Sequence, residues 1–315
     1  MRNWILLLFM SAATAAWGQD DNLRMRFDFT DVKGTSVNDA LSGITAKTVS
    51  PAKVIEMGAY HVLSLGTGSG YLNLTADAGT LLAGMDNFTV SVYYRVDESA
   101  SLSGNGHFLW AFSTLASNTA TAGAYTAYRL NVQRVASATA GYETEKGCEV
   151  GAASQQGSWV HVAYTQSGTT GRLYINGRLQ GSVSGVPRPS TLFSATKPGS
   201  CWVGRAPFSG DNYLRNTLVY DFRLDDCALT ASDVLALSAE TAALDNAYIH
   251  GSQGTTTALE ATLADARALL DAPDGYLPDA LRELSSMVAL AETVVAGGCS
   301  QAYIDQIRTR LNALI

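Results

Sequence analysis

The segment SWVHVAYTQSGTTGRLYINGRLQG, residues 158–181, consists of three alternating runs separated by two turn sequences. In the first run, Val160, Val162 and Tyr164 fall on one face, and apolar residues also occur on the other. A period of two with apolar residues on both faces predicts a strand packed on both sides. The loop sequence SGTTG and the dipeptide Asn176–Gly177 are typical of hairpin turns. The segment therefore predicts a three-stranded antiparallel meander.

Short runs of the same kind occur from about Leu23 to Asp226, between stretches rich in Gly, Ser and Thr. Strands at this spacing, joined by turns rather than helices, are typical of a β-sandwich and not of alternating β–α–β units. The runs are Leu23–Phe29, Val62–Leu65, Tyr71–Leu74, Phe88–Val96, Phe108–Phe112, Tyr128–Val132, Trp202–Gly204 and Leu218–Leu224.

The pattern becomes helical from Thr230, which suits the N-cap of the first of several Ala/Leu-rich runs. Pro278 suits the first turn of a later helix, and Gly297 and Gly298 end that helix. In two of these runs, apolar residues recur at helical spacing and so lie on one face of a helix. They are Leu259, Leu263, Ala266 and Leu270 in one run, and Tyr303, Ile307, Leu311 and Leu314 in the last. The tail of about 80 residues therefore predicts a small antiparallel helical bundle.

The amino-acid composition bears on which kinds of macromolecule the protein can bind. The chain has 315 residues, of which 47% are hydrophobic and 16% charged, and its net charge is −7. The hydrophobic content is enough for real cores. A phosphate-binding surface needs clustered Lys and Arg, and the sequence has no basic stripe, so we expect neither nucleic acid nor anionic membranes as partners.

The N-terminus has the pattern of a signal peptide. Arg2 precedes the apolar run Trp4–Met10, which is followed by small residues and then by polar ones. Cleavage after Gly18 is predicted, and cleavage after Ala15 is an open alternative. The apolar run is too short for a membrane anchor, and no later run is long enough to span a membrane. We expect a secreted, periplasmic or cell-surface protein.

In an exported protein, the four cysteines are candidates for disulfide bonds. Their spacing does not suit a zinc site, and an even number in an oxidising compartment favours disulfides. Three connectivities are open, and four free thiols are an alternative. From their places along the predicted elements, we expect one bridge within the sandwich and one between the sandwich and the helices; the pairs are Cys148–Cys201 and Cys227–Cys299.

Five ordered segments resemble the laminin-G-like, concanavalin A-type jelly roll of secreted bacterial proteins. They are FDF at 27–29, LSLGTGSGYLNL at 63–74, NFTVSVYYRV at 87–96, the meander at 158–181 and YDFRLDDCALTASDVLAL at 220–237. The resemblance implies an all-β jelly-roll sandwich, concanavalin A-like, in which the meander is part of the framework of a ligand-binding domain.

The helical tail resembles, more weakly, the three-helix modules that accompany sugar-binding domains in bacterial surface proteins. A spacer without a ligand is an open alternative. The chain is therefore divided into a signal peptide (1–18), a jelly-roll sandwich (19–229) and a small all-α helical bundle (230–315).

Glucanases of this fold carry E-x-D-x-x-E on one strand, because glycoside hydrolysis requires two carboxylates flanking the bond. This sequence lacks that motif. In the nearest acidic cluster, separations of two and four residues place Glu143, Glu145 and Glu149 on one side of a predicted strand, and we interpret it as a solvated face. The prediction is a protein that is not an enzyme.

Many laminin-G-like domains bind Ca²⁺ through carboxylates near the first and last strands, helped by carbonyl oxygens and water. The resemblance places Asp28, Asp39 and Asp221 at such positions. However, Tyr220 replaces the acid common before Asp221, and Thr217 replaces a glycine. A structural calcium ion and ordinary surface aspartates are both open.

A sugar site needs aromatic rings with exposed faces and polar side chains beside them. The loop 208–213 supplies Phe208, Asp211, Asn212 and Tyr213 between turn residues, and the stretch 123–129 supplies Tyr125 and Tyr128. Trp110 and Trp202 lie inside apolar runs and are predicted as core.

Two functions follow from these observations. The first is a secreted, non-catalytic module that binds a polysaccharide or glycoconjugate. The alternative is a structural or adhesive surface protein that recognises protein partners.

Overall fold

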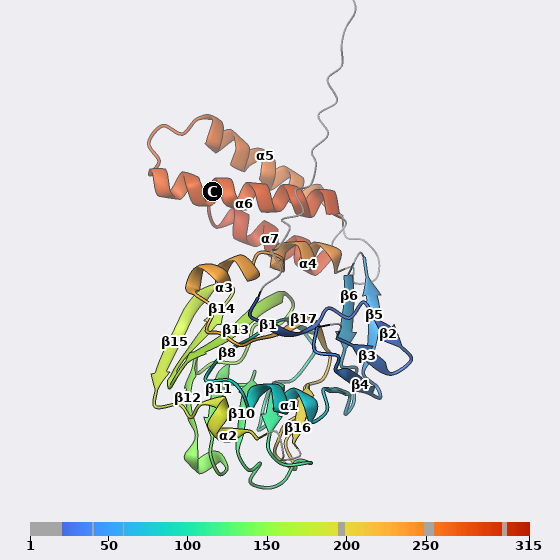
Figure 1. Cartoon of the computed structure of the whole chain (residues 1–315). Helices are drawn as coiled ribbons and strands as arrows, with labels where there is room; N and C mark the ends of the chain where they lie inside the picture. The colour runs from blue at the N-terminus through green and yellow to red at the C-terminus, as the bar shows by residue number, and fades with distance from the viewer. Residues whose placement is uncertain (1–20, 40, 59, 195–198, 249–254, 298–300) are drawn as a thin grey trace, which may run out of the picture.

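The computed structural model describes residues 21–39, 41–58, 60–194, 199–248, 255–297 and 301–315. Within them the chain forms two large antiparallel sheets packed face to face, followed by helices (Figure 1). The predicted jelly-roll sandwich is confirmed, and helices occur where the tail predicted them.

Each sheet mixes strands from distant parts of the chain. Sheet A runs β15 (Arg178–Ser184), β14 (Thr170–Ile175), β13 (Trp159–Ser167), β8 (Asn87–Val96), β17 (Thr217–Asp225), β6 (Tyr60–Ser64) and β5 (Lys53–Met57), with β1 (Leu23–Phe27) also paired to β17. Sheet B runs β12 (Lys146–Glu149), β11 (Arg134–Ala138), β10 (Tyr125–Arg129), β9 (Phe108–Ser113), β16 (Ser200–Val203), β7 (Tyr71–Asn73), β4 (Thr45–Val49), β3 (Ser36–Asn38) and β2 (Val32–Lys33). Short helices α1 (Asp77–Leu82), η1 (Tyr142–Thr144) and α2 (Pro189–Leu192) connect strands.

The meander predicted from residues 158–181 is β13, β14 and β15, paired antiparallel in chain order. Asn176 and Gly177 form its second turn, with φ of 48° and 75°. Two successive positive φ values define the turn type that Asn–Gly favours, because both residues tolerate the left-handed region. The local sequence therefore determined this part of sheet A.

The core lies between the sheets. Strand alternation sends Trp110, Phe112 and Tyr128 of sheet B toward Phe222 of sheet A, and all four are at most 1% exposed. The Trp110 and Tyr128 rings stack at 6.5 Å between centroids, and the Phe112 and Phe222 rings lie 6.4 Å apart. Trp110 is thus confirmed as a core residue.

Helices α3 (Ala231–Leu237) and α4 (Thr241–Ala247) cover the outer face of sheet A, between the sandwich and the remaining helices (Figure 1). Thr230 caps α3 as predicted, since its hydroxyl accepts from the Asp233 N–H and the Asp233 carboxylate accepts from the Thr230 N–H. Val234 packs on β13 and β14, and Leu244 packs on β6, β8 and β13.

Helices α5 (Thr257–Asp271), α6 (Pro278–Gly297) and α7 (Gln301–Asn312) share a separate apolar core. The predicted stripes supply most of it; its buried residues are Leu259, Leu263, Ala266, Leu284, Val288, Ala291, Val294, Tyr303, Ile304, Ile307 and Leu311. Helices α3 and α4 pack on sheet A instead, and α4 also contacts α6. The predicted boundary at residue 230 stays a prediction.

One carboxylate under α4 gives the fold a pH dependence. The Asp245 Oδ1 accepts from the Trp159 N–H at 2.8 Å, and burial raises the pKa of Asp245 to about 7, opposed by that hydrogen bond and by Arg95. In the unfolded chain the pKa is about 3.9. Because the folded protein keeps a proton that the unfolded chain has lost, this contribution to the free energy of unfolding is full below about pH 4 and lost as pH rises through 7.

We therefore expect Asp245→Asn, which keeps the acceptor oxygen and removes the charge, to have a higher Tm than the parent at pH 8. The gap should narrow toward pH 4, and thermal melts followed by circular dichroism at the two pH values measure it. Asp279→Asn is the control, since that side chain is 89% exposed. A gap of equal size at both pH values would contradict the assigned role of Asp245.

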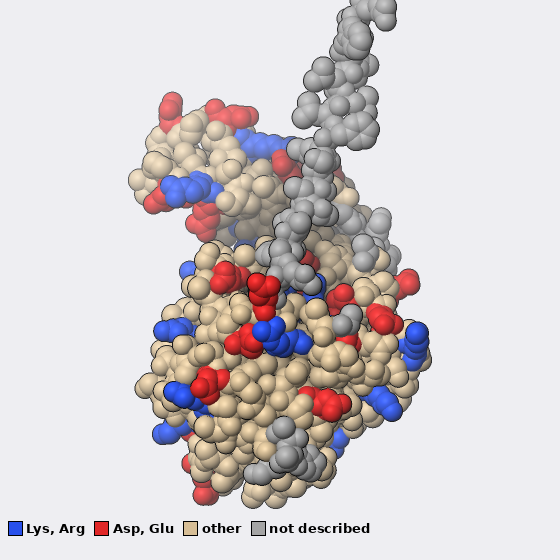
Figure 2. Space-filling model, in the orientation of Figure 1, with Lys and Arg blue, Asp and Glu red and all other residues tan. Residues whose placement is uncertain are grey.

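On the face shown in Figure 2, Lys and Arg side chains are scattered among Asp and Glu and form no continuous basic patch. In the part of the chain that the structure describes, no helix is long and apolar enough to cross a membrane. The predicted signal peptide, residues 1–18, lies outside the described residues and stays a prediction.

Candidate functional site on the outer face of sheet B

The outer face of sheet B carries large aromatic rings where β7 and β16 pair. In β16, Cys201 and Val203 join the core between the sheets, so the intervening Trp202 points outward. In β7, Leu72 joins the same core, so Tyr71 points outward beside it. The Tyr71 and Trp202 rings meet edge to face at 6.0 Å between centroids.

Gly204 turns the chain directly after β16. Its φ is 91°, and a Cβ there would lie 2.8 Å from Leu65 Cδ1, so a larger residue would be strained on both counts. The turn brings Arg205 back over the outer face, where its guanidinium carbon lies 4.2 Å from the Trp202 ring centroid and 4.8 Å from that of Tyr71. At these distances the cation is attracted by the rings.

Neutral groups hold the Arg205 guanidinium. Its Nη1 donates to the Tyr71 hydroxyl and its Nη2 to Asn118 Oδ1, both at 2.9 Å. Its Nε has no hydrogen-bond partner among the described residues. Within the same residues, no carboxylate lies in ion-pair distance of Arg205. The positive charge is thus oriented by neutral groups and has no carboxylate partner in the described part of the chain.

Tyr213 completes this group, which we name the arginine–aromatic cluster: Tyr71, Trp202, Arg205 and Tyr213. The Tyr213 ring lies 6.2 Å from that of Tyr71, and its centroid is 5.8 Å from the guanidinium carbon. Tyr71, Arg205 and Tyr213 are half-buried, whereas Trp202 is 3% exposed beneath them. Trp202 is therefore buried as predicted, but on the outer face rather than in the core between the sheets.

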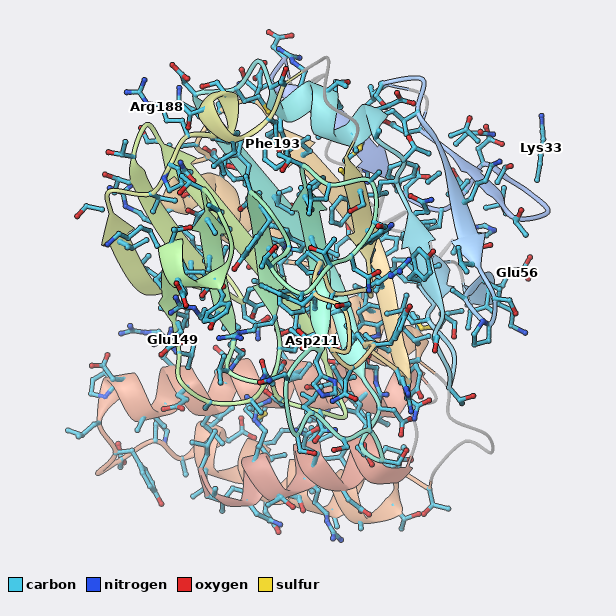
Figure 3. All side chains as sticks on the ribbon, turned by 90° about the horizontal axis from the view of Figure 1, so that it is seen from below. Lys33, Glu56, Glu149, Arg188, Phe193 and Asp211 are labelled. Carbon is cyan, nitrogen blue, oxygen red and sulfur yellow. The ribbon has the colours of Figure 1, made fainter. Side chains whose placement is uncertain are left out.

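The rest of the predicted loop lies apart from these rings. Phe208 packs edge to face on Tyr125 at 5.4 Å and is half-buried. Asn212 is exposed, and its Nδ2 donates to the Asn105 carbonyl at 3.0 Å. Asp211, which Figure 3 labels near the middle of the molecule, is half-buried, and burial raises its pKa against the pull of Arg129 and His107.

Two predicted ligand residues are corrected. Tyr125 and Tyr128 are both 0% exposed. Tyr128 faces the core between the sheets and stacks on Trp110, and Tyr125 lies on the outer face under Phe208, with its hydroxyl bound to Glu145 at 2.5 Å. Because side chains alternate between the two faces of a strand, both tyrosines lie among apolar residues, one on each face of sheet B. Neither ring is therefore accessible to a ligand.

The predicted acidic cluster is built around Arg134. Glu143 lies in the short helix η1 rather than on a strand, which corrects the predicted strand face. The Glu145 carboxylate accepts from Tyr125 through one oxygen and from Arg134 through the other, and Glu149 also binds Arg134. Two of the three carboxylates are therefore held in ion pairs with one guanidinium.

The three aspartates predicted for calcium do not gather. Asp28 accepts from Thr30, Asp39 accepts from the backbone of its own turn, and Asp221 forms an ion pair with Arg26 at 2.5 Å. The guanidinium occupies one acceptor position of the Asp221 carboxylate and already supplies a positive charge beside it. Across the described ranges no group of three or more His, Cys, Asp or Glu is placed to hold a metal. These residues do not fit a shared ion, and calcium stays an untested prediction.

The predicted Cys148–Cys201 bridge is wrong. Cys148 is on β12 and Cys201 on β16, with β11, β10 and β9 between them. Four strand spacings amount to about 19 Å, and a disulfide needs Cα atoms within about 7 Å. Both side chains are buried and in the free form. The other predicted bridge involves Cys299, which lies outside the described residues.

Burial raises the pKa of Cys148 to about 11 and that of Cys201 to about 12. Because the thiolate is the reactive form, both should resist alkylation at pH 7.5 in the native protein. We expect iodoacetamide to label them at least 100-fold faster in denaturant, as measured by mass spectrometry of the peptides. A 148–201 crosslink in the non-reduced digest would overturn this arrangement.

Two face-to-face antiparallel sheets with this strand order define a concanavalin A-like β-sandwich. A family model described as the concanavalin A-like lectin/glucanases superfamily matches residues 66–235, more than half of the chain. The chain belongs to this superfamily. Among curated protein sequences, none matches it.

Solved structures with the same fold are distant in sequence. Domain 4 of AbnA, an extracellular arabinanase of Geobacillus stearothermophilus solved with arabinotriose, is 15% identical, with a TM-score of 0.53 over 69% of this chain and 98% of that one. A botulinum neurotoxin type C structure, whose cell entry is described as dependent on two ganglioside molecules, is 15% identical, with a TM-score of 0.50 over 74% and 53%. Trypanosoma rangeli sialidase is 16% identical with a TM-score of 0.47, and the chain spans 33% of it.

Sequence reasoning found Tyr213 but missed Tyr71, Arg205 and Asn118. Tyr71 and Asn73 alternate with the apolar Leu72, which was a signal that they face outward. Nothing local predicted that Arg205 and Asn118, 87 residues apart, would meet through a 2.9 Å hydrogen bond.

Proposed function

We propose that the protein is a secreted, non-catalytic glycan-binding protein whose sandwich holds a sugar at the arginine–aromatic cluster. The observation that supports this most directly is the placement of Arg205 among three rings, without a carboxylate partner among the residues that the structure describes. Half-buried Tyr71 and Tyr213 offer ring surface to pyranose or furanose C–H groups. The guanidinium and Asn118 offer donors to sugar oxygens.

A glycan array probed with residues 19–315 tests this proposal. Arabinotriose is a first probe for calorimetry, because the arabinanase domain of the same fold was solved with it. The array should include neutral and acidic oligosaccharides, since a cation without a carboxylate partner attracts both hydroxyl and carboxylate oxygens. Absence of binding across the array would reject the proposal and favour the adhesive, protein-binding alternative.

We propose further that the protein does not hydrolyse its glycan. The carboxylates nearest to a catalytic pair, Glu145 and Glu149, are held by Arg134, and the E-x-D-x-x-E motif is absent from the sequence. The expected result is no release of reducing sugar from common polysaccharides. Release that survives further purification and disappears in Glu145→Gln would contradict this expectation.

A further inference from the structure

A groove lies at the edge of sheet A, away from the arginine–aromatic cluster. It comprises a cavity of about 430 Å³ and a neighbouring one of about 210 Å³, and both are lined by Ile55, Leu218 and Tyr248. The larger volume falls within the range of about 300–1,000 Å³ typical of ligand sites. Figure 3 shows Glu56, which lines the smaller cavity, at the margin of the molecule and well apart from Asp211.

A buried cation lines the larger cavity. Arg95 is 3% exposed, its Nη2 donates to the Gly157 carbonyl at 2.9 Å, and its guanidinium carbon lies 3.6 Å from the Tyr248 ring centroid. Its Nε has no hydrogen-bond partner among the described residues. A buried donor without a partner is unfavourable, so this guanidinium has hydrogen-bonding capacity that the described residues do not use.

The charges around the groove argue against an anionic ligand. Asp97 lines the same cavity, Glu98 Oε1 lies 3.9 Å from Arg95 Nη2, and Glu56 lines the smaller cavity. Asp245 also attracts Arg95. One guanidinium thus faces several carboxylates, and a further negative charge would be repelled.

Uncharged polar groups and apolar surface supply the remaining walls. Hydroxyl and amide side chains line the larger cavity, namely Ser64, Thr67, Ser99 and Asn216. Met57 and Ile55 line the smaller one, together with the Tyr248 ring. This combination suits a ligand that has hydroxyl groups on its edges and C–H groups on its faces.

We propose that this groove is a second glycan-binding site, which takes a neutral oligosaccharide of two or three residues. This inference rests on the proposed function, because the ligand is again a glycan. The second site, however, consists of other residues, on sheet A. Arg95 donates to sugar oxygens at one end, and Ile55, Leu218 and Tyr248 contact the sugar faces along the groove.

Nuclear magnetic resonance of the two Arg Nε–H groups tests both sites in one titration. The Arg95 and Arg205 signals are assigned from Arg95→Lys and Arg205→Lys in the ¹⁵N-labelled protein, residues 19–315. Arabinotriose and cellotriose are the neutral probes, and trigalacturonate is the acidic one. We expect a neutral probe to shift the Arg95 signal with saturation.

Thr67→Trp should weaken that titration at least tenfold, because Thr67 is exposed, lines the cavity and would fill it as Trp. Ser69→Trp, in the same turn but outside the lining, should change it less than twofold. Comparison of the two spectra also shows whether each variant is folded.

The outcomes separate the two proposals. If the probes shift the Arg205 signal alone, the groove is not a glycan site and the proposed function stands. If they shift the Arg95 signal alone, the groove binds the glycan and the arginine–aromatic cluster does not. If neither signal moves, or Thr67→Trp binds as well as Ser69→Trp, the inference is wrong. A stronger response to trigalacturonate at Arg95 would overturn the neutral class.

Discussion

Trp110→Ala is expected to lower the free energy of unfolding by about 3–5 kcal/mol. Trp110 is 1% exposed between the two sheets and contacts the Phe112 and Tyr128 rings. Its removal loses the burial of a large apolar side chain and leaves a cavity that strands pinned by hydrogen bonds on both sides cannot close. Urea titration followed by fluorescence, with an unchanged m value, measures the loss.

Tyr142→Ala is the matched control, since that aromatic side chain of the sandwich is 62% exposed. Its free energy of unfolding should stay within about 0.5 kcal/mol of the parent. A small loss in Trp110→Ala, comparable with the control, would mean that the core between the sheets does not depend on this ring.

Tyr213→Ala is expected to weaken glycan binding by about 10- to 100-fold, which corresponds to about 1.4–2.8 kcal/mol. The ring is half-buried beside Tyr71 and Arg205, so its loss removes contact surface and also one side of the guanidinium's aromatic surroundings. Calorimetric titration with the best glycan from the array measures the change. Stability should fall little, because the ring is outside the core between the sheets.

Tyr276→Ala serves as its control. That tyrosine is 48% exposed between α5 and α6, so its removal should leave glycan affinity unchanged. Equal affinity in Tyr213→Ala and the parent would show that the glycan does not depend on this ring, and the titration of Arg95 would then test whether it binds in the groove.

The sequence by itself determined the local elements of this protein. A period of two predicted β13, β14 and β15, and Asn176–Gly177 predicted the turn that joins the last two. Thr230 and Pro278 marked the starts of α3 and α6. These features depend on neighbours a few residues away, so backbone preferences and side-chain alternation are sufficient to predict them.

Only the tertiary structure decided which distant residues meet. Alternation placed Tyr71 and Trp202 outside the core, but their contact exists because β7 pairs with β16, strands more than 120 residues apart. The same strand order separates Cys148 from Cys201 and lays Phe208 over Tyr125. A period of two specifies the face of a side chain, whereas its neighbours depend on the order in which strands pair, which is a global property of the sheet.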